Sequence, residues 1–145
     1  MKIAIGADHT AVGLKSIIKD HLSSLGHEVE DVGPYSEEST DYPLFAEKVS
    51  KRVQSGEADK GILICGTGIG MSIAANKFDG IRAAAVSEPF SARATREHND
   101  ANIVCFGSRV VGSELAKMIV DTFLGADYEG GRHQNRIDQI KSFEK

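Results

Sequence analysis

A cysteine followed by three glycines within five positions is the feature of this sequence most suited to chemistry. The segment GILICGTGIGMSIAANK, residues 61–77, brings an apolar run into Cys65 and then into the loop Gly66–Gly70. A glycine-rich turn that opens a helix exposes backbone N–H groups, and the helix dipole adds partial positive charge, so an anion or a developing oxyanion is stabilised there. The same field favours the thiolate of Cys65, the form that accepts a proton. The pattern indicates a base beside an oxyanion site.

Familiar glycine motifs do not account for this loop. It lacks the Gly-Lys-Ser/Thr ending of a nucleotide P-loop, which removes the main support for ATP binding. It has Met71 where G-x-G-x-x-G requires a third glycine, although Glu88 lies at a distance suited to a ribose, so a dinucleotide stays an alternative. A plain tight turn is also open, with Cys65 as a small buried core residue. We assign Cys105, inside an apolar run, to core packing.

A second set of polar side chains lies nearer the C-terminus. Arg132 and Arg136 are four residues apart, so on a helix both guanidinium groups project from one face and can bind one phosphate. A solvated basic face paired with acidic neighbours is the alternative. His98 has two interpretations, a general acid near neutral pH or a histidine that contacts carbonyls at a helix end. The histidines assigned to surface or structural roles are His21, His27 and His133.

A metal site is a further alternative. Asp8, His9, Cys65 and His98 carry ligand atoms, but they lack a compact spacing and would have to converge from different strands. The sequence has no C-x-x-C pair, and its two cysteines are too few for a disulfide framework. We therefore expect reduced thiols, no metal and no cofactor.

Alternating strands and helices must position these residues. Short apolar or β-branched runs predict strands at residues 2–6, 28–32, 60–65, 82–86 and 102–106. Apolar residues at helical spacing, with glycine stops, predict helices over residues 12–25, 44–53, 70–77, 89–98, 113–124 and 132–143. Parallel strands need crossover connections, which are usually helices on both faces of the sheet. The expected fold class is α/β, a three-layer Rossmann-like domain with a five-stranded parallel sheet.

The ends of the predicted strands gather candidate side chains. Ligands of open parallel sheets bind beyond the carboxyl ends of the strands. Asp8 and His9 follow the first predicted strand, Cys65 ends the third, Ser87 follows the fourth and Arg109 follows the fifth. We expect several of these residues to meet at one rim of the sheet.

Length and composition are those of an ordinary globular chain. The 145 residues, with 41% hydrophobic and 26% charged, predict one domain over residues 1–145, which at this size buries roughly two-thirds of its surface. The net charge of −4 gives no global attraction to nucleic acid. No apolar run approaches the roughly 20 residues that span a bilayer, and the N-terminus lacks signal-peptide features. We expect a cytoplasmic protein with neither a nucleic-acid nor a membrane partner.

Five motifs together carry a family resemblance. The sequence contains, in this order and with these separations, IGADH, LICGTGIGMSIAANK, EHND, FGSRVVG and YEGGRHQNR. Each motif is weak alone, but in register across the chain they closely resemble the RpiB/LacAB sugar-phosphate isomerase family. The resemblance implies a cofactor-free aldose–ketose isomerisation that interconverts D-ribose 5-phosphate and D-ribulose 5-phosphate in the pentose phosphate pathway.

The resemblance also implies roles for single residues. Cys65 matches the base that moves a proton between C2 and C1 through a cis-enediolate, whereas some members carry a glutamate where this chain has Met71. The loop would donate N–H groups to the enediolate oxygens, and the Thr67 hydroxyl would help shuttle protons between them. His98 matches the proton donor that opens the furanose ring. The implied substrate-binding residues are Gly66, Thr67, Gly68, Ile69 and Gly70 of the loop, Asp8 and Asn99 for sugar hydroxyls, His9, Arg132 and Arg136 for the phosphate, and Arg109.

A site completed by a neighbouring subunit is the last implication. We therefore expect a homodimer or a dimer of dimers, with the C-terminal helix reaching the partner subunit and with inactive isolated monomers. Two alternatives stay open. The first is an isomerase of a six-carbon sugar phosphate, allose 6-phosphate or galactose 6-phosphate; the second is a non-catalytic sugar-phosphate sensor, against which Cys65 and His98 argue.

Overall fold

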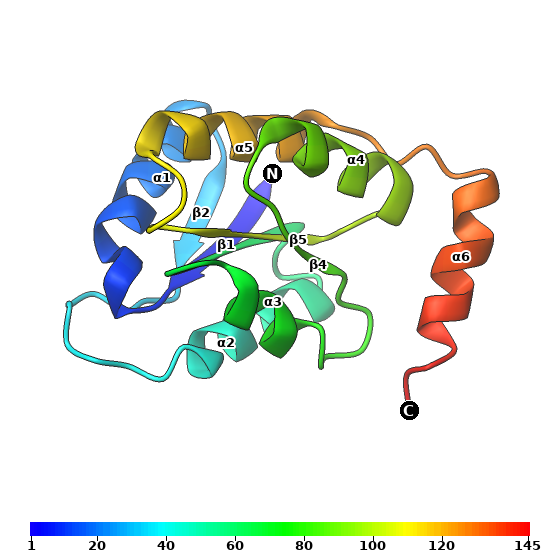
Figure 1. Ribbon diagram of the computed structural model, residues 1–145, viewed down its shortest axis with the longest axis horizontal. Helices are drawn as coiled ribbons and strands as arrows, with labels where there is room; N and C mark the ends of the chain where they lie inside the picture. Colours follow the sequence, from blue (N-terminus) through cyan, green and yellow to red (C-terminus); the bar gives the residue numbers. More distant parts are fainter.

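One parallel sheet forms the middle layer of the structure, a computed structural model that describes residues 1–145 (Figure 1). Its strands are β1 (Lys2–Ala7), β2 (Glu28–Asp31), β3 (Lys60–Cys65), β4 (Ala83–Ala85) and β5 (Ile103–Gly107). Their order across the sheet is β2-β1-β3-β5-β4, and every pairing is parallel. The predicted five-stranded parallel sheet is confirmed, and each predicted strand begins and ends within one residue of the observed one.

Helices cover both faces of this sheet. They are the 3-10 turn η1 (His9–Ala11) and the helices α1 (Val12–Ser24), α2 (Pro43–Gln54), α3 (Ile69–Ala75), α4 (Pro89–Asn99), α5 (Ser113–Gly125) and α6 (Arg132–Lys141). On one face α1, α4 and α5 pack on the sheet, and α2 and α3 pack on the other (Figure 1). The three-layer prediction is thereby confirmed. No helix has both the length and the apolar composition that crossing a membrane requires.

The two halves of the core take alternate residues of the strands. Ile62 and Ile64 of β3 pack in the cluster under α1, α4 and α5, whereas Leu63 and Cys65 point into the cluster under α2 and α3. This follows from the two-residue period of a strand, which sends successive side chains to opposite faces. Cys65, the last residue of β3, therefore lies at the carboxyl edge of the sheet and on the α2/α3 face.

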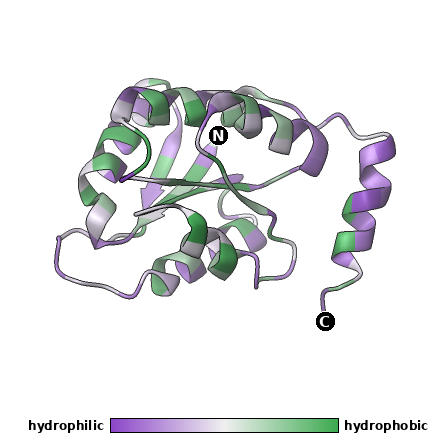
Figure 2. Cartoon of the chain, in the orientation of Figure 1, coloured by the Kyte–Doolittle hydropathy of each residue, from purple (hydrophilic) through white to green (hydrophobic).

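The C-terminal helix α6 stands apart from the three layers. It begins beside the end of α4 and projects beyond the sheet (Figure 1). Figure 2 shows α6 as mostly hydrophilic, yet Ile140 is 50% exposed and Phe143 just beyond the helix is 81% exposed. A groove of about 820 Å³ separates this C-terminal segment from the body, with Ile81 and Ala83 among its lining residues. Large apolar side chains thus remain uncovered on a C-terminal segment with little contact to its own domain.

Candidate active site

The carboxyl edge of the sheet brings together the ends of three neighbouring strands. The Asp8 backbone N–H donates to the Ile64 carbonyl at 3.0 Å, which joins the end of β1 to β3. On the other side of β3, Ser108 donates to the Cys65 carbonyl at 2.8 Å, and Arg109 donates to the Gly66 carbonyl at 3.1 Å. The structure therefore places Asp8, Cys65 with its loop, and Arg109 at one rim, as the sequence predicted.

Two glycines let the loop after Cys65 lie close to its neighbours. Gly68 has φ +82°, in the left-handed region that glycine adopts without steric cost, and a Cβ there would lie 2.7 Å from the Phe106 backbone. A Cβ on Gly70 would lie 2.7 Å from the ring of Tyr42. The loop is thus fixed between β5 on one side and the start of α2 on the other.

The sulfur of Cys65 accepts a hydrogen bond from this loop. The Gly68 N–H donates to Sγ at 3.1 Å. The cysteine is only 6% exposed and shares its cluster with the apolar side chains Phe45 and Met71. Both interpretations of the sequence are therefore met in part: the thiol is packed in the core, and a backbone donor points at its sulfur. The N–H dipole stabilises negative charge on sulfur, whereas burial opposes it.

The second cysteine is a pure core residue. Cys105 is fully buried in the same cluster, and burial, with a smaller contribution from Cys65, raises the pKa of its thiol far above the ordinary value. A thiol of this kind stays protonated and unreactive near neutral pH. The assignment of Cys105 to core packing is confirmed.

Polar groups around the loop have free hydrogen-bonding positions. Thr67 is exposed, and its Oγ1 accepts the Ile69 N–H at 3.2 Å, so its own hydroxyl proton can be donated elsewhere. Asp8 caps η1: its Oδ1 accepts from the Thr10 N–H at 2.9 Å and from the Thr10 hydroxyl at 2.6 Å, while Oδ2 makes no such bond. His9 accepts the Thr40 N–H at Nδ1, 3.2 Å, which leaves Nε2 as the protonated donor.

The remaining predicted residues lie at the opposite edge of the sheet. His98 and Asn99 end α4, which returns from the carboxyl edge to the amino edge (Figure 1). There the Asn99 carbonyl accepts from Nε of Arg82, the residue just before β4, at 3.0 Å. The metal alternative is not supported, because His98 lies at the edge opposite Asp8, His9 and Cys65.

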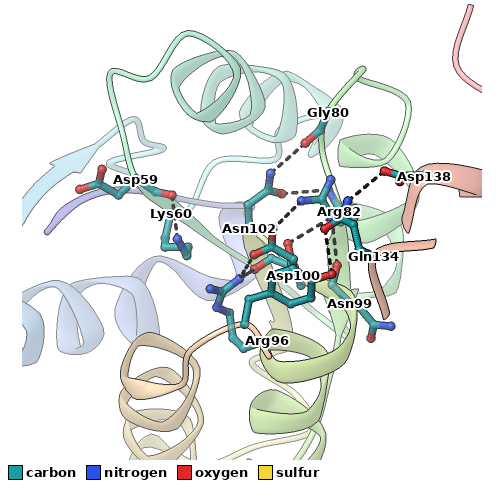
Figure 3. A network of polar contacts seen from close by, with 12 residues as sticks. Asp59, Lys60, Gly80, Arg82, Arg96, Asn99, Asp100, Asn102, Gln134 and Asp138 are labelled. Atoms are coloured by element: carbon teal, nitrogen blue, oxygen red, sulfur yellow. Dashed lines mark hydrogen bonds and ion pairs between the residues drawn. The ribbon is translucent and has the colours of Figure 1, made fainter. Parts of the chain in front are cut away.

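A network of polar contacts fixes this end of α4 (Figure 3). Arg96 donates to Asp100 Oδ1 at 2.8 Å, and Arg82 reaches Asp100 Oδ2 at 3.3 Å. Asp100 itself has φ +48° and ends the helix. The side-chain oxygen of Asn102 accepts the Arg82 N–H at 2.8 Å. These contacts hold the last turn of α4, and therefore His98, in a defined position.

Arg132 and Arg136 lie on α6, also away from the carboxyl edge. The helix there is confirmed, and the four-residue spacing places the two exposed side chains as neighbours along one face. Neither guanidinium makes an ion pair in the structure, unlike Arg52, Arg82, Arg93 and Arg96. The alternative of a basic face paired with acidic neighbours is therefore not what the structure contains.

A contact that the sequence analysis missed joins α4 to α6. The His98 ring stacks on His133 with centroids 4.6 Å apart and planes at 19°, and Glu129 Oε1 lies 3.3 Å from His133 Nε2 and 3.7 Å from His98 Nε2. Glu129 lies before α6 rather than on it, so the i, i+4 rule for helices gave no signal for its contact with His133. Nothing in the spacing indicated that His98, on another helix, joins them.

Comparison with known proteins gives consistent matches over nearly the whole chain. The sequence model of the family described as Ribose/Galactose Isomerase matches residues 3–140. Ribose-5-phosphate isomerase B of Escherichia coli (strain K12) is 60% identical over 144 residues, which cover 99% of this chain and 97% of that protein. The structure of Clostridium thermocellum ribose-5-phosphate isomerase B superposes with a TM-score of 0.97 at 55% identity, covering 98% of this chain and 96% of that one. The Mycoplasma genitalium ribose-5-phosphate isomerase B, solved with bound ribulose-5-phosphate, superposes with a TM-score of 0.93 at 46% identity, covering 98% and 95%.

Proposed function

The chain belongs to the ribose/galactose isomerase family and is an aldose–ketose isomerase, and we propose that it interconverts D-ribose 5-phosphate and D-ribulose 5-phosphate in the pentose phosphate pathway. The 60% identity to the Escherichia coli enzyme supports the choice of substrate. The observation that carries the chemistry is the position of Cys65, whose sulfur lies 3.1 Å from the Gly68 nitrogen at the rim where three strands end. No cofactor takes part in the proposed reaction.

Cys65 is the base in this proposal. Its thiolate removes the proton from C2 of the aldose and returns a proton to C1, so that the reaction passes through a cis-enediolate. The Gly68 N–H supports the sulfur in its charged form. A loop donor that faces the enediolate oxygens instead stabilises the transition state, and the loss of one such donor typically costs about 3 kcal/mol in the barrier. Cys105 cannot take over this role, because burial raises the pKa of its thiol.

The loop and its neighbours handle the oxygens of the sugar. Backbone N–H groups of Gly66–Gly70 stabilise the negative charge that develops on O1 and O2. The Thr67 hydroxyl, which has its proton free, carries protons between these two oxygens. Asp8 offers its unused Oδ2 to a sugar hydroxyl, and Arg109, whose backbone is bound to the loop, adds a further substrate contact.

In this proposal the other site residues come from a second copy of the chain. His98 acts as the acid that opens the furanose ring, Asn99 contacts a hydroxyl, and Arg132 and Arg136 bind the phosphate together with His9 of the first copy. Because α4 ends at the amino edge, one chain alone cannot bring His98 to its own Cys65. The proposal is therefore a homodimer or dimer of dimers in which each site combines the carboxyl edge of one protomer with the α4–α6 end of the other.

Uncovered apolar surface supports this assembly. Ile140 and Phe143 are exposed along a groove of about 820 Å³ that the chain itself leaves unfilled. Covering them with a second copy would remove apolar area from water at roughly 25 cal/mol per Å². The same proposal places the enzyme in the cytoplasm, where its two free thiols stay reduced.

A coupled isomerase assay with EDTA present tests the proposed reaction. We expect turnover of ribose 5-phosphate that survives the chelator, with a higher kcat/KM than for allose 6-phosphate or galactose 6-phosphate. A higher kcat/KM for a six-carbon sugar phosphate would overturn the choice of substrate. Binding of the sugar phosphate with no exchange of its C2 proton with solvent would overturn catalysis altogether.

A further inference from the structure

Three metal-ligating side chains meet where the end of α4 contacts the start of α6 and the segment between α5 and α6. They are His98 at the end of α4, Glu129 in the connection, and His133 in the first turn of α6. One nitrogen or oxygen atom of each lies within 4.8 Å of the other two. Two imidazoles and one carboxylate form a donor set that zinc takes in proteins, with water as the fourth ligand.

Two of the three donor separations are close to those of a tetrahedral zinc site. Bonds of about 2.0–2.1 Å at tetrahedral angles put two ligand atoms about 3.3 Å apart. Glu129 Oε1 already lies 3.3 Å from His133 Nε2, and it lies 3.7 Å from His98 Nε2. Both Nε2 atoms thus lie within 4 Å of the same carboxylate oxygen, and the two rings are stacked nearly parallel. Because an imidazole binds a metal in the plane of its ring, the exposed His98 ring has to turn out of the stack for the ion to enter, while His133 and Glu129 keep their positions.

Burial and anchoring prepare this arrangement. The His133 side chain is only 11% exposed, and the backbone N–H of Glu129 donates to the Glu97 carbonyl at 3.0 Å. Burial thus holds the His133 ring, and the backbone bond fixes the chain at Glu129. The His98 side chain is 47% exposed, so it can turn and leaves an approach for the ion and its water. The neighbouring Arg132 opposes a divalent cation, which favours reversible binding over a permanent structural ion.

We propose that His98 Nε2, Glu129 Oε1 and His133 Nε2 bind one Zn²⁺ ion and that the bound ion inhibits the isomerase. Zinc occupies the nitrogen through which His98 exchanges protons, so His98 no longer opens the sugar ring. This inhibition rests on the function proposed for His98, whereas the binding of zinc does not. The ion itself takes no part in turnover, so this proposal agrees with the activity that we expect in EDTA.

Titration of the full-length, EDTA-treated and desalted protein with ZnCl₂ tests the binding. Calorimetry is expected to give one ion per chain, with Kd weakened at least about tenfold in His133→Gln and in Glu129→Gln. His21→Gln is the matched control, since His21 Nε2 also contacts a carboxylate, Asp121 Oδ1 at 2.8 Å, but has no second histidine. Its Kd should equal that of the wild type. Co²⁺ in place of Zn²⁺ should give d–d absorption without a thiolate charge-transfer band, since the sulfur of Cys65 is not a ligand.

Activity measurements with the same proteins test the inhibition. Zinc should inhibit the wild type and His21→Gln at concentrations near the measured Kd, and EDTA should restore their activity. Glu129→Gln and His133→Gln should need at least about tenfold more zinc for the same fractional inhibition, with each protein compared with its own zinc-free rate. Absence of stoichiometric binding, or binding that both variants retain, overturns the site. Binding without inhibition overturns the regulatory role. If the zinc-free protein has no isomerase activity, the proposed function fails, and the titration still decides whether the site exists.

Discussion

Gly68→Ala probes the loop that supports Cys65. Gly68 has φ +82°, and a Cβ there would lie 2.7 Å from the backbone of Phe106. Carbon atoms in contact prefer about 3.5–4.0 Å, so the loop must move by about 1 Å, because the backbone of the buried strand β5 does not yield. That movement stretches the 3.1 Å contact between the Gly68 nitrogen and Cys65 Sγ and shifts the N–H groups that we propose as donors to the substrate.

The expected effect on catalysis follows from this displacement. A misplacement of about 1 Å at a reacting centre can cost about 100-fold in rate. We therefore expect kcat/KM for ribose 5-phosphate to fall by about two orders of magnitude in Gly68→Ala, measured in the coupled assay. The left-handed backbone adds a stability cost of about 1–2 kcal/mol for any residue with a Cβ.

Gly56→Ala separates the two effects. Gly56 has nearly the same backbone angle, φ +81°, but nothing lies within 4 Å of a Cβ built there. This variant should lose about 1–2 kcal/mol of stability, or about 2–8 °C in Tm, and keep wild-type kcat/KM. Gly68→Ala should be less stable than Gly56→Ala as well as far less active. If Gly68→Ala instead matches Gly56→Ala in both Tm and kcat/KM, the loop is not the preorganised element that the mechanism requires.

Three further predictions address the base and the shared site. Cys65→Ala should lower kcat by about 10²–10⁴-fold with little change in phosphate affinity, and full activity in the coupled assay would exclude Cys65 as the base. Iodoacetamide at pH 8 should alkylate Cys65 ahead of Cys105 in the folded protein, because burial raises the pKa of Cys105 and keeps it a neutral thiol. Peptide mass spectrometry after digestion measures the order of labelling, and earlier labelling of Cys105 would contradict the prediction. Inactive Cys65→Ala and His98→Ala proteins, unfolded and refolded together, should recover roughly a quarter of wild-type activity, since half of the dimers are mixed and one of their two sites is intact. No recovery, with mixed dimers detected by mass, would mean that both residues serve one protomer.

The local pattern of the sequence was sufficient to predict the sheet. The apolar strand from Lys60 to Cys65 was predicted at its observed bounds, because both of its faces are buried and its residues are accordingly apolar. The meeting of Asp8, Cys65 and Arg109 followed from the parallel arrangement alone. The burial of Cys65 did not, because it depends on how α2 and α3 pack over the end of β3, which the local sequence does not encode.

The separation of His98 from Cys65 was predictable from topology. A crossover helix in a parallel sheet starts at the carboxyl edge and returns to the amino edge, so a residue in its last turn lies opposite the strand ends. The stacking of His98 on His133 was not predictable in this way. It depends on the path of the connection before α6, where Gly130 and Gly131 both adopt positive φ, +68° and +58°. Such backbone angles set a direction that hydrophobic periodicity cannot reveal.

The two edges of the sheet divide the chemistry of the proposed reaction. The carboxyl edge carries the base and the loop donors, and the amino edge, with α6, carries the acid and the phosphate ligands. In this proposal a single chain brings together neither the contacts for both ends of the substrate nor the two proton-transfer groups, and we expect activity to depend on association. An ion at His98 and His133 would act on the acid half alone and leave Cys65 and its loop unchanged. Zinc should accordingly suppress conversion of the cyclic sugar while exchange of the C2 proton on substrate that is already open-chain continues, a difference that proton-exchange NMR can measure directly.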